Sequence, residues 1–102
     1  MKVRVYYLRG RPDHSEIQEV KTIQKWMLDN LYDLVWEAEF KNVVTPDIIA
    51  TRFRLEPNPF GISFKKKTSH TDLTAGDLIQ IGSTNYLVLP EGFREMNTHI
   101  PE

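Results

Sequence analysis

The chain has 102 residues, of which 40% are hydrophobic and 26% are charged, and its formal net charge is −1. This length suits one domain with a hydrophobic core, and the near-neutral charge excludes a strongly basic protein that coats nucleic acid. The absence of cysteine excludes a disulfide, a thiolate metal site and a cysteine nucleophile.

The amino-terminal residues lead directly into a strand pattern. In residues 3–8, Val3, Val5 and Tyr7 alternate with the other side chains, which predicts a first strand. No run of about 18 apolar residues occurs in the sequence, so we expect no signal peptide and no membrane span. These features predict a cytoplasmic protein.

A long helix is expected from about Ser15 to Leu31. Asp13 and Ser15 are followed three residues later by Glu16 and Gln18, which is the spacing of a capping box. Apolar residues then recur at helical spacing, and we expect this face to pack against the core. Its members are Ile17, Val20, Ile23, Met27, Leu28 and Leu31.

A second strand is expected over residues 34–40, after an exit loop at residues 30–33. Its side chains alternate between apolar and polar, and Glu37 and Glu39 share one face. Paired carboxylates can act as a general acid and base. No histidine or metal-ligand cluster lies nearby in the sequence, so we interpret the two glutamates as part of a solvent-exposed face.

A short helix is predicted from Pro46 to about Phe53, because Thr45 can cap it and Pro46 suits its first position. The segment 55–61 contains two prolines and is expected to be a loop, with Phe60 turned inward. Residues 62–64 are a candidate for a further strand.

A basic segment follows, in which Lys65, Lys66 and Lys67 adjoin Phe64. Arg52 and Arg54 lie slightly upstream. Phosphates attract such clusters, and an aromatic ring can stack on a base. Exposed lysines also prevent sheet edges from associating, and the net-acidic composition favours this second interpretation.

The carboxyl-terminal third predicts a hairpin of two strands, Leu78–Ile81 and Tyr86–Leu89, joined by a turn at residues 82–85. Both strands are apolar at nearly every position, so we expect them to lie centrally with both faces covered. Phe93 and Met96 predict a short edge strand after the hairpin.

Gly76 and Asp77 precede this hairpin and are interpreted as a structural turn, because glycine tolerates unusual backbone angles and aspartate accepts nearby N–H groups. The alternative is a catalytic or metal-binding carboxylate at Asp77. His70 lies two residues from Asp72, and such a pair could orient a base.

Residues 69–96 resemble the carboxyl-terminal part of the YodL-like domains, which are small bacterial and mobile-element modules. In that family a turn ending in glycine and aspartate opens a strand, and a glycine-phenylalanine pair closes the next one. Thr74-Ala75 and Thr71-Asp72 depart from the family pattern. The resemblance implies a fold and no particular reaction. The matching positions are Leu73, Gly76, Asp77, Leu78, Tyr86, Gly92 and Phe93.

Together these patterns predict one α+β domain over residues 1–102, with elements in the order β-α-β-α-β-β-β. A mainly antiparallel sheet carries the long helix packed on one face, and the second helix is short. We expect no cofactor and no metal site, because the 3 histidines are scattered and no phosphate-binding glycine loop occurs.

The leading functional hypothesis is a small non-catalytic module that binds another protein, as an accessory protein of a bacterial, phage or mobile-element genome. Its oligomeric state is left open. The alternatives are a nucleic-acid-binding protein that uses the Lys/Arg patch, and a small enzyme with a pocket around His70 and Asp77. The expected binding residues are Arg52, Arg54, Phe60, Phe64, Lys65, Lys66 and Lys67, joined by Tyr6 and Trp26 where these are exposed.

Overall fold

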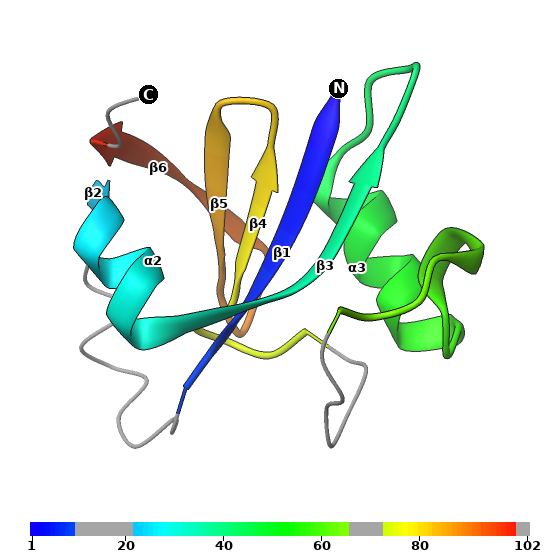
Figure 1. Cartoon of the computed structure of the whole chain (residues 1–102), viewed down its shortest axis with the longest axis horizontal. Coiled ribbons are helices and arrows are strands. Elements are labelled where there is room, and N and C mark those ends of the chain that lie inside the picture. The colour runs from blue at the N-terminus through cyan, green and yellow to red at the C-terminus, as the bar shows by residue number, and fades with distance from the viewer. Residues whose placement is uncertain (10–21, 66–72, 100–102) are drawn as a thin grey trace.

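The computed structural model describes residues 1–9, 22–65 and 73–99. Within them, six strands form one sheet in the order β2-β6-β5-β4-β1-β3 (Figure 1). The strands are β1 (Lys2–Leu8), β2 (Thr22–Gln24), β3 (Tyr32–Glu39), β4 (Leu78–Ile81), β5 (Thr84–Val88) and β6 (Phe93–His99). The helices are α2 (Lys25–Leu31) and α3 (Pro46–Leu55), followed by the 3₁₀ turn η1 (Pro59–Gly61).

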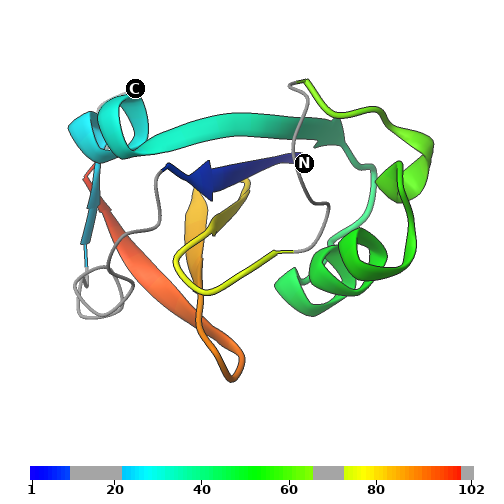
Figure 2. The same cartoon turned by 90° about the horizontal axis from the view of Figure 1, so that it is seen from below.

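Five of these strands pair antiparallel, from β3 through β1, β4 and β5 to β6. Strand β2 extends the sheet by pairing parallel with β6. The helices α2 and α3 lie at opposite ends of the molecule in both views (Figures 1 and 2). The predicted α+β class with a mainly antiparallel sheet is therefore confirmed.

Each face of the sheet carries its own hydrophobic cluster, because successive side chains of a strand point to opposite faces. Val3 and Val5 on β1 are fully buried on the face that α3 covers. Tyr6 and Leu8 belong to the other face, which α2 covers. The α2-side cluster consists of Leu8, Met27, Tyr32, Leu78, Leu87 and Met96.

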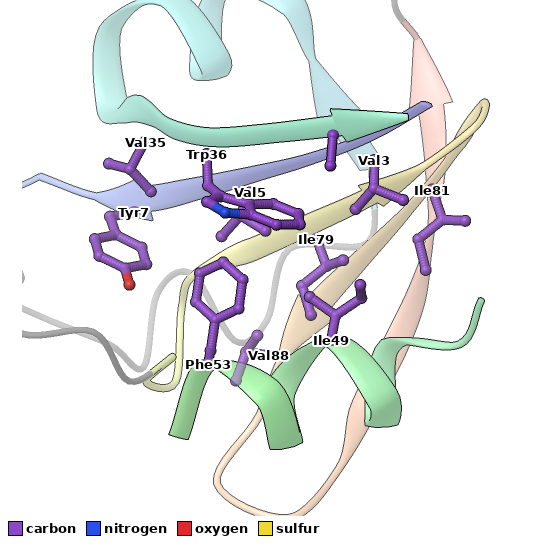
Figure 3. Packing of buried hydrophobic residues seen from close by; sticks show 11 residues of the cluster. Val3, Val5, Tyr7, Val35, Trp36, Ile49, Phe53, Ile79, Ile81 and Val88 are labelled. Carbon is purple, nitrogen blue, oxygen red and sulfur yellow. The ribbon is translucent and has the colours of Figure 1, made fainter. Parts of the chain in front are cut away.

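The α3-side cluster is the larger one and is shown in Figure 3. Ile49 and Phe53 lie four residues apart on α3 and are both fully buried against the sheet. The ring of Phe53 meets Trp36 edge-on at 5.2 Å between centroids, an arrangement that aromatic rings prefer. The cluster consists of Val3, Val5, Tyr7, Val35, Trp36, Ala38, Ile49, Phe53, Ile79, Ile81 and Val88.

A β-bulge in β3 supplies two neighbouring residues to this cluster. Val5 pairs with Trp36 and Tyr6 pairs with Leu34, so Val35 is an extra residue between the two pairs. A bulge changes which face the following side chains occupy. Val35 and Trp36 can therefore both be buried on the α3 side.

The central position predicted for the hairpin is confirmed, since β5 and β4 lie in the middle of the sheet. Strand β5 begins at Thr84, earlier than predicted, because Ile81 pairs with Thr84 and the turn contains only Gly82 and Ser83. Gly82 has a φ of +61°. Glycine adopts this angle without steric cost, which suits a two-residue hairpin turn.

The predicted helix from Ser15 to Leu31 is wrong at residues 22–24, which form β2; residues 15–21 lie outside the described residues. Thr22 and Ile23 are β-branched and suit a strand. The spacing of Ile23 and Met27 fits a helix equally well, so only the pairing of β2 with β6 shows that residues 22–24 form a strand and not a helix. Helix α2 retains the predicted apolar face through Met27, Leu28 and Leu31.

Three further expectations need correction. Tyr32 and Asp33 begin β3 and do not form an exit loop. Strand β6 runs from Phe93 to His99 between β5 and β2, so it is longer than expected and is not an edge strand. Residues 62–64 form no strand, although they lie beside β3.

Residues 62–65 lie along the outer edge of β3. The backbone N–H of Lys65 donates to the carbonyl of Val35 at 2.7 Å, and the indole N–H of Trp36 donates to the carbonyl of Ile62 at 3.1 Å. Phe64 packs edge-on against Phe53 at 5.4 Å between centroids. This segment therefore covers part of a sheet edge that would otherwise expose backbone donors and acceptors.

Candidate binding groove

A groove of about 440 Å³ opens between α2 and the face of the sheet that α2 covers. Strands β1, β3 and β4 form its floor, and α2 forms one wall. The groove is lined by Arg4, Tyr6, Arg9, Lys25, Leu28, Asp29, Tyr32, Asp33, Leu34 and Gln80.

The alternation of β1 explains why polar residues form the floor. Val3 and Val5 are buried on the opposite face, so Arg4 and Tyr6 must point toward α2. In the neighbouring strands, Arg4 stands opposite Glu37 on β3 and Gln80 on β4. The register therefore brings one cation, one carboxylate and one amide into a row across three strands.

Tyr6 gives the groove an amphipathic floor. Its ring packs against the α2-side cluster, and burial raises the pKa of its phenol, although the nearby Arg4 charge opposes this. The hydroxyl therefore keeps its proton at neutral pH and can both donate and accept a hydrogen bond. Leu28 and Leu34 add apolar surface beside it.

Two ion pairs also line the groove, one between residues that follow β1 and begin β3 and the other on α2. Arg9 Nε lies 2.8 Å from Asp33 Oδ1, and Lys25 Nζ lies 2.8 Å from Asp29 Oδ2. The hydrogen bond that Lys25 donates to Asp29 also raises the pKa of Lys25. Each pair is neutral as a whole, so the two pairs offer both signs of charge without an excess of either.

Three cationic side chains lie near Glu37 of β3, and one of them, Arg4, also lines the groove. We call Lys2, Arg4, Glu37 and Lys65 the Glu37 cluster. Arg4 Nε donates to Glu37 Oε2 at 2.7 Å. Lys2 Nζ and Lys65 Nζ lie 3.8 Å and 4.0 Å from Glu37 Oε1. One carboxylate balances one of the three cations, so the cluster carries two positive charges in excess.

The cations also change the acidity of Glu37. The hydrogen bond from Arg4 is the largest effect and lowers the pKa of the Glu37 carboxyl. Burial raises this pKa by a smaller amount, and the charges of Lys2, Arg4 and Lys65 lower it further. Glu37 in turn raises the pKa of Arg4. Both side chains are therefore charged at neutral pH.

The residues expected to form one binding patch are dispersed by the fold. Arg52 Nη1 pairs with Glu56 at 2.8 Å, and Arg52 Cζ lies over the ring of Phe60, 5.3 Å from its centroid. Arg54 is exposed on α3, and Phe60 and Phe64 pack against the α3-side cluster. Helix α3 covers the opposite face of the sheet from the Glu37 cluster.

Lys65 is the member of the expected patch that joins the Glu37 cluster. Lys66 and Lys67 lie outside the described residues. Of the other aromatic candidates, Trp26 on α2 is 53% exposed, and Tyr6 is half-buried within the groove.

Glu37 and Glu39, considered above as a carboxylate pair, have different partners. Glu39 Oε1 lies 3.4 Å from the amino-terminal nitrogen of Met1, whereas Glu37 belongs to its own cluster. Among the described residues, no three histidine, aspartate or glutamate side chains gather in a way that could hold a metal ion.

Gly76 and Asp77 lie in a buried turn before β4. The carboxylate of Asp77 accepts the N–H groups of Leu8 and Thr74, each at 2.9 Å, and the hydroxyl of Thr74 at 3.2 Å. Gly76 has a φ of +100°, and its carbonyl accepts the hydroxyl of Tyr32 at 2.7 Å. His70 lies outside the described residues.

Sequence reasoning missed Arg9, Lys25, Asp29 and Asp33 as residues of one groove. The spacing of Lys25 and Asp29 on α2 is a signal for a helical ion pair. The pairing of Arg9 with Asp33 has no such signal, because it depends on where β1 ends beside β3.

None of the helices that the structure describes is long and apolar enough to cross a membrane. No protein-family model, no curated protein and no solved structure matches this chain. The resemblance to the YodL-like domains therefore stays a prediction.

Proposed function

We propose that this protein is a non-catalytic module that binds another protein, and that a peptide segment of the partner occupies the groove between α2 and the sheet. The observation that carries this proposal is the composition of the groove, in which apolar side chains and two ion pairs share one lining. Tyr6 and Leu34 can contact apolar side chains of a peptide, and the ion pairs can orient its polar groups.

The state of the ionisable groups supports recognition more than catalysis. A general acid or base works best when its pKa lies near the working pH. The hydrogen bond from Arg4 lowers the pKa of Glu37, away from neutral pH. Asp29 and Asp33 each form an ion pair with a cationic side chain. Paired side chains of this kind are suited to binding.

Trp26 is an exposed aromatic residue of the helix that forms one wall of the groove, although it does not line the groove itself. It follows Lys25 on α2 and is 53% exposed. Tryptophan and arginine are enriched among the residues that contribute most to protein interfaces.

The dispersal of the expected Lys/Arg patch makes a nucleic-acid interface less favoured. Arg52 is neutralised by Glu56, and Lys65 lies beside Glu37 on the other face of the sheet. The resemblance to YodL-like domains adds to the proposal that the module serves a bacterial, phage or mobile-element genome and acts in the cytoplasm.

Selection of peptides from a random display library tests the proposal. Peptides selected on the wild-type protein should bind Leu34→Arg at least about tenfold more weakly, because the new side chain would fill the groove. The matched control is Ile48→Arg, which makes the same change in charge on the outer surface of α3, where Ile48 is 45% exposed. Its affinity should equal that of the wild type.

Circular dichroism should show that both variants remain folded. Failure to select any peptide would argue against peptide binding altogether. Equal binding by both variants would place the peptide site outside the groove.

A further inference from the structure

We propose that the Glu37 cluster binds carboxylate side chains of an acidic polypeptide segment, an inference that rests on the proposed function and names the chemistry of the partner. The cluster places the cations of Lys2, Arg4 and Lys65 within 4.0 Å of one carboxylate. Glu37 holds these cations together and leaves two positive charges for a ligand.

The cations of the cluster are accessible to such a ligand. The side chains of Lys2, Arg4 and Lys65 are 49%, 37% and 48% exposed. Lys2 and Lys65 approach the same oxygen of Glu37, so their ammonium groups are close enough for one acidic segment to contact both.

Arg4 connects the cluster to the groove. Its Nε donates to Glu37 and its Nη1 lies 3.4 Å from Gln80 Oε1. A guanidinium carries five N–H donors in a planar fork that matches a carboxylate. Arg4 can therefore bind an acidic side chain of the partner while it keeps its bond to Glu37.

The position of the cluster is set by backbone contacts as well as by charge. Lys2 and Arg4 are on β1, opposite Glu39 and Glu37 of β3. Lys65 is held beside β3 by its N–H bond to Val35. Since the backbone positions of all three cations are held by the fold, an acidic segment would meet a preformed site.

The charge pattern along the groove favours a polypeptide over a nucleic acid. One end has the surplus positive charge of the Glu37 cluster, and the other has the carboxylates of Asp29 and Asp33, each already paired. The phosphates of a nucleic acid are spaced evenly and would meet both ends. A polypeptide can place acidic residues at one end alone.

Fluorescence anisotropy with a labelled octaglutamate peptide tests this inference. The double variant Lys2→Gln/Lys65→Gln should bind the peptide at least about tenfold more weakly than the wild type, and wild-type binding should weaken as salt is raised. The matched control is Arg52→Gln/Arg54→Gln, which removes the same charge from α3. Its affinity should stay within about twofold of the wild-type value.

Equal losses in the two double variants would overturn the inference, because overall charge alone would then explain binding. A labelled twelve-nucleotide oligothymidine is measured in the same way. If the wild type binds it more tightly than octaglutamate, and Lys2→Gln/Lys65→Gln loses this binding, the ligand of the cluster is a nucleic acid and the inference is wrong. The peptides selected from the library distinguish this inference from the proposed function. If they bind the groove without an excess of acidic residues, and bind Lys2→Gln/Lys65→Gln as tightly as the wild type, the inference is refuted and the proposed function stands.

Discussion

The carboxylate of Asp77 accepts the backbone N–H of Leu8 at 2.9 Å, although the two residues are 69 positions apart in the chain. Leu8 ends β1, and Asp77 immediately precedes β4, the neighbouring strand. Both residues are buried. The bond therefore ties the end of one central strand to the start of the next, and Thr74 completes the turn with two further bonds to the same carboxylate.

Asp77→Ala should destabilise the protein by about 3 kcal/mol, because it leaves the N–H groups of Leu8 and Thr74 without this acceptor and an unmet buried donor costs about 1–3 kcal/mol. Urea denaturation followed by circular dichroism measures the change. Asp29→Ala is the control, since Asp29 belongs to an exposed ion pair on α2 and should change stability by less than about 1 kcal/mol. A stable Asp77→Ala protein would contradict a structural role for this turn.

Tyr32→Phe should cost about 1 kcal/mol at neutral pH, because the carbonyl of Gly76 loses a buried hydroxyl donor. Burial raises the pKa of Tyr32 above its ordinary value of 10.0, and the nearby charge of Asp77 raises it further. The folded protein therefore keeps this proton at a pH where the unfolded chain releases it. Stability must fall as the pH rises above about 10.

The free energy of unfolding of Tyr32→Phe should consequently decline less steeply than that of the wild type between about pH 9 and pH 11. Denaturant titrations at successive pH values measure both slopes. Parallel curves for the two proteins would show that Tyr32 is not responsible for the alkaline loss of stability.

Glu37→Gln should lower stability at neutral pH by less than about 1 kcal/mol, since the Glu37 cluster is partly exposed to solvent and is screened. The pKa of Glu37 is lowered from 4.5, chiefly by the hydrogen bond from Arg4. A carboxyl with a lowered pKa contributes stability that is present above its unfolded pKa and lost as the pH falls through its folded pKa. The difference between the two proteins should therefore disappear in acid.

Thermal unfolding from neutral pH down to about pH 3 measures this difference. Glu39→Gln is the comparison on the same strand and should have a smaller effect, because Glu39 is 68% exposed and lies 3.4 Å from the amino-terminal nitrogen of Met1. A variant Glu37→Gln that is more stable than the wild type at neutral pH would mean that the cluster is not held together by this carboxylate.

Ile49→Ala and Ile48→Ala form a matched pair on α3. Ile49 is fully buried in the α3-side cluster, whereas Ile48 is 45% exposed. Removing the buried side chain should cost about 2–5 kcal/mol through lost burial and the cavity that remains, and the exposed substitution should cost less than about 1 kcal/mol. Urea denaturation measures the loss of stability in each variant. Equal losses would contradict the packing of α3 on the sheet through Ile49.

Several elements follow from local patterns of the sequence. The alternation around Val3 and Val5 identifies β1, because a strand buries every second residue. Thr45 and Pro46 identify the start of α3, where the Thr45 hydroxyl accepts the N–H of Ile48 at 3.4 Å. Caps, turns and periodicity act over a few residues, so they can be recognised without knowledge of the rest of the fold.

The groove and the Glu37 cluster could not be found in this way. Lys2, Arg4, Glu37 and Lys65 come from three distant segments, and only the register of β1 with β3 and the path of residues 62–65 bring them together. The bulge at Val35 likewise depends on pairing. Which face a residue occupies is a local property of its strand, whereas its neighbours across the sheet depend on how separate segments pair and pack.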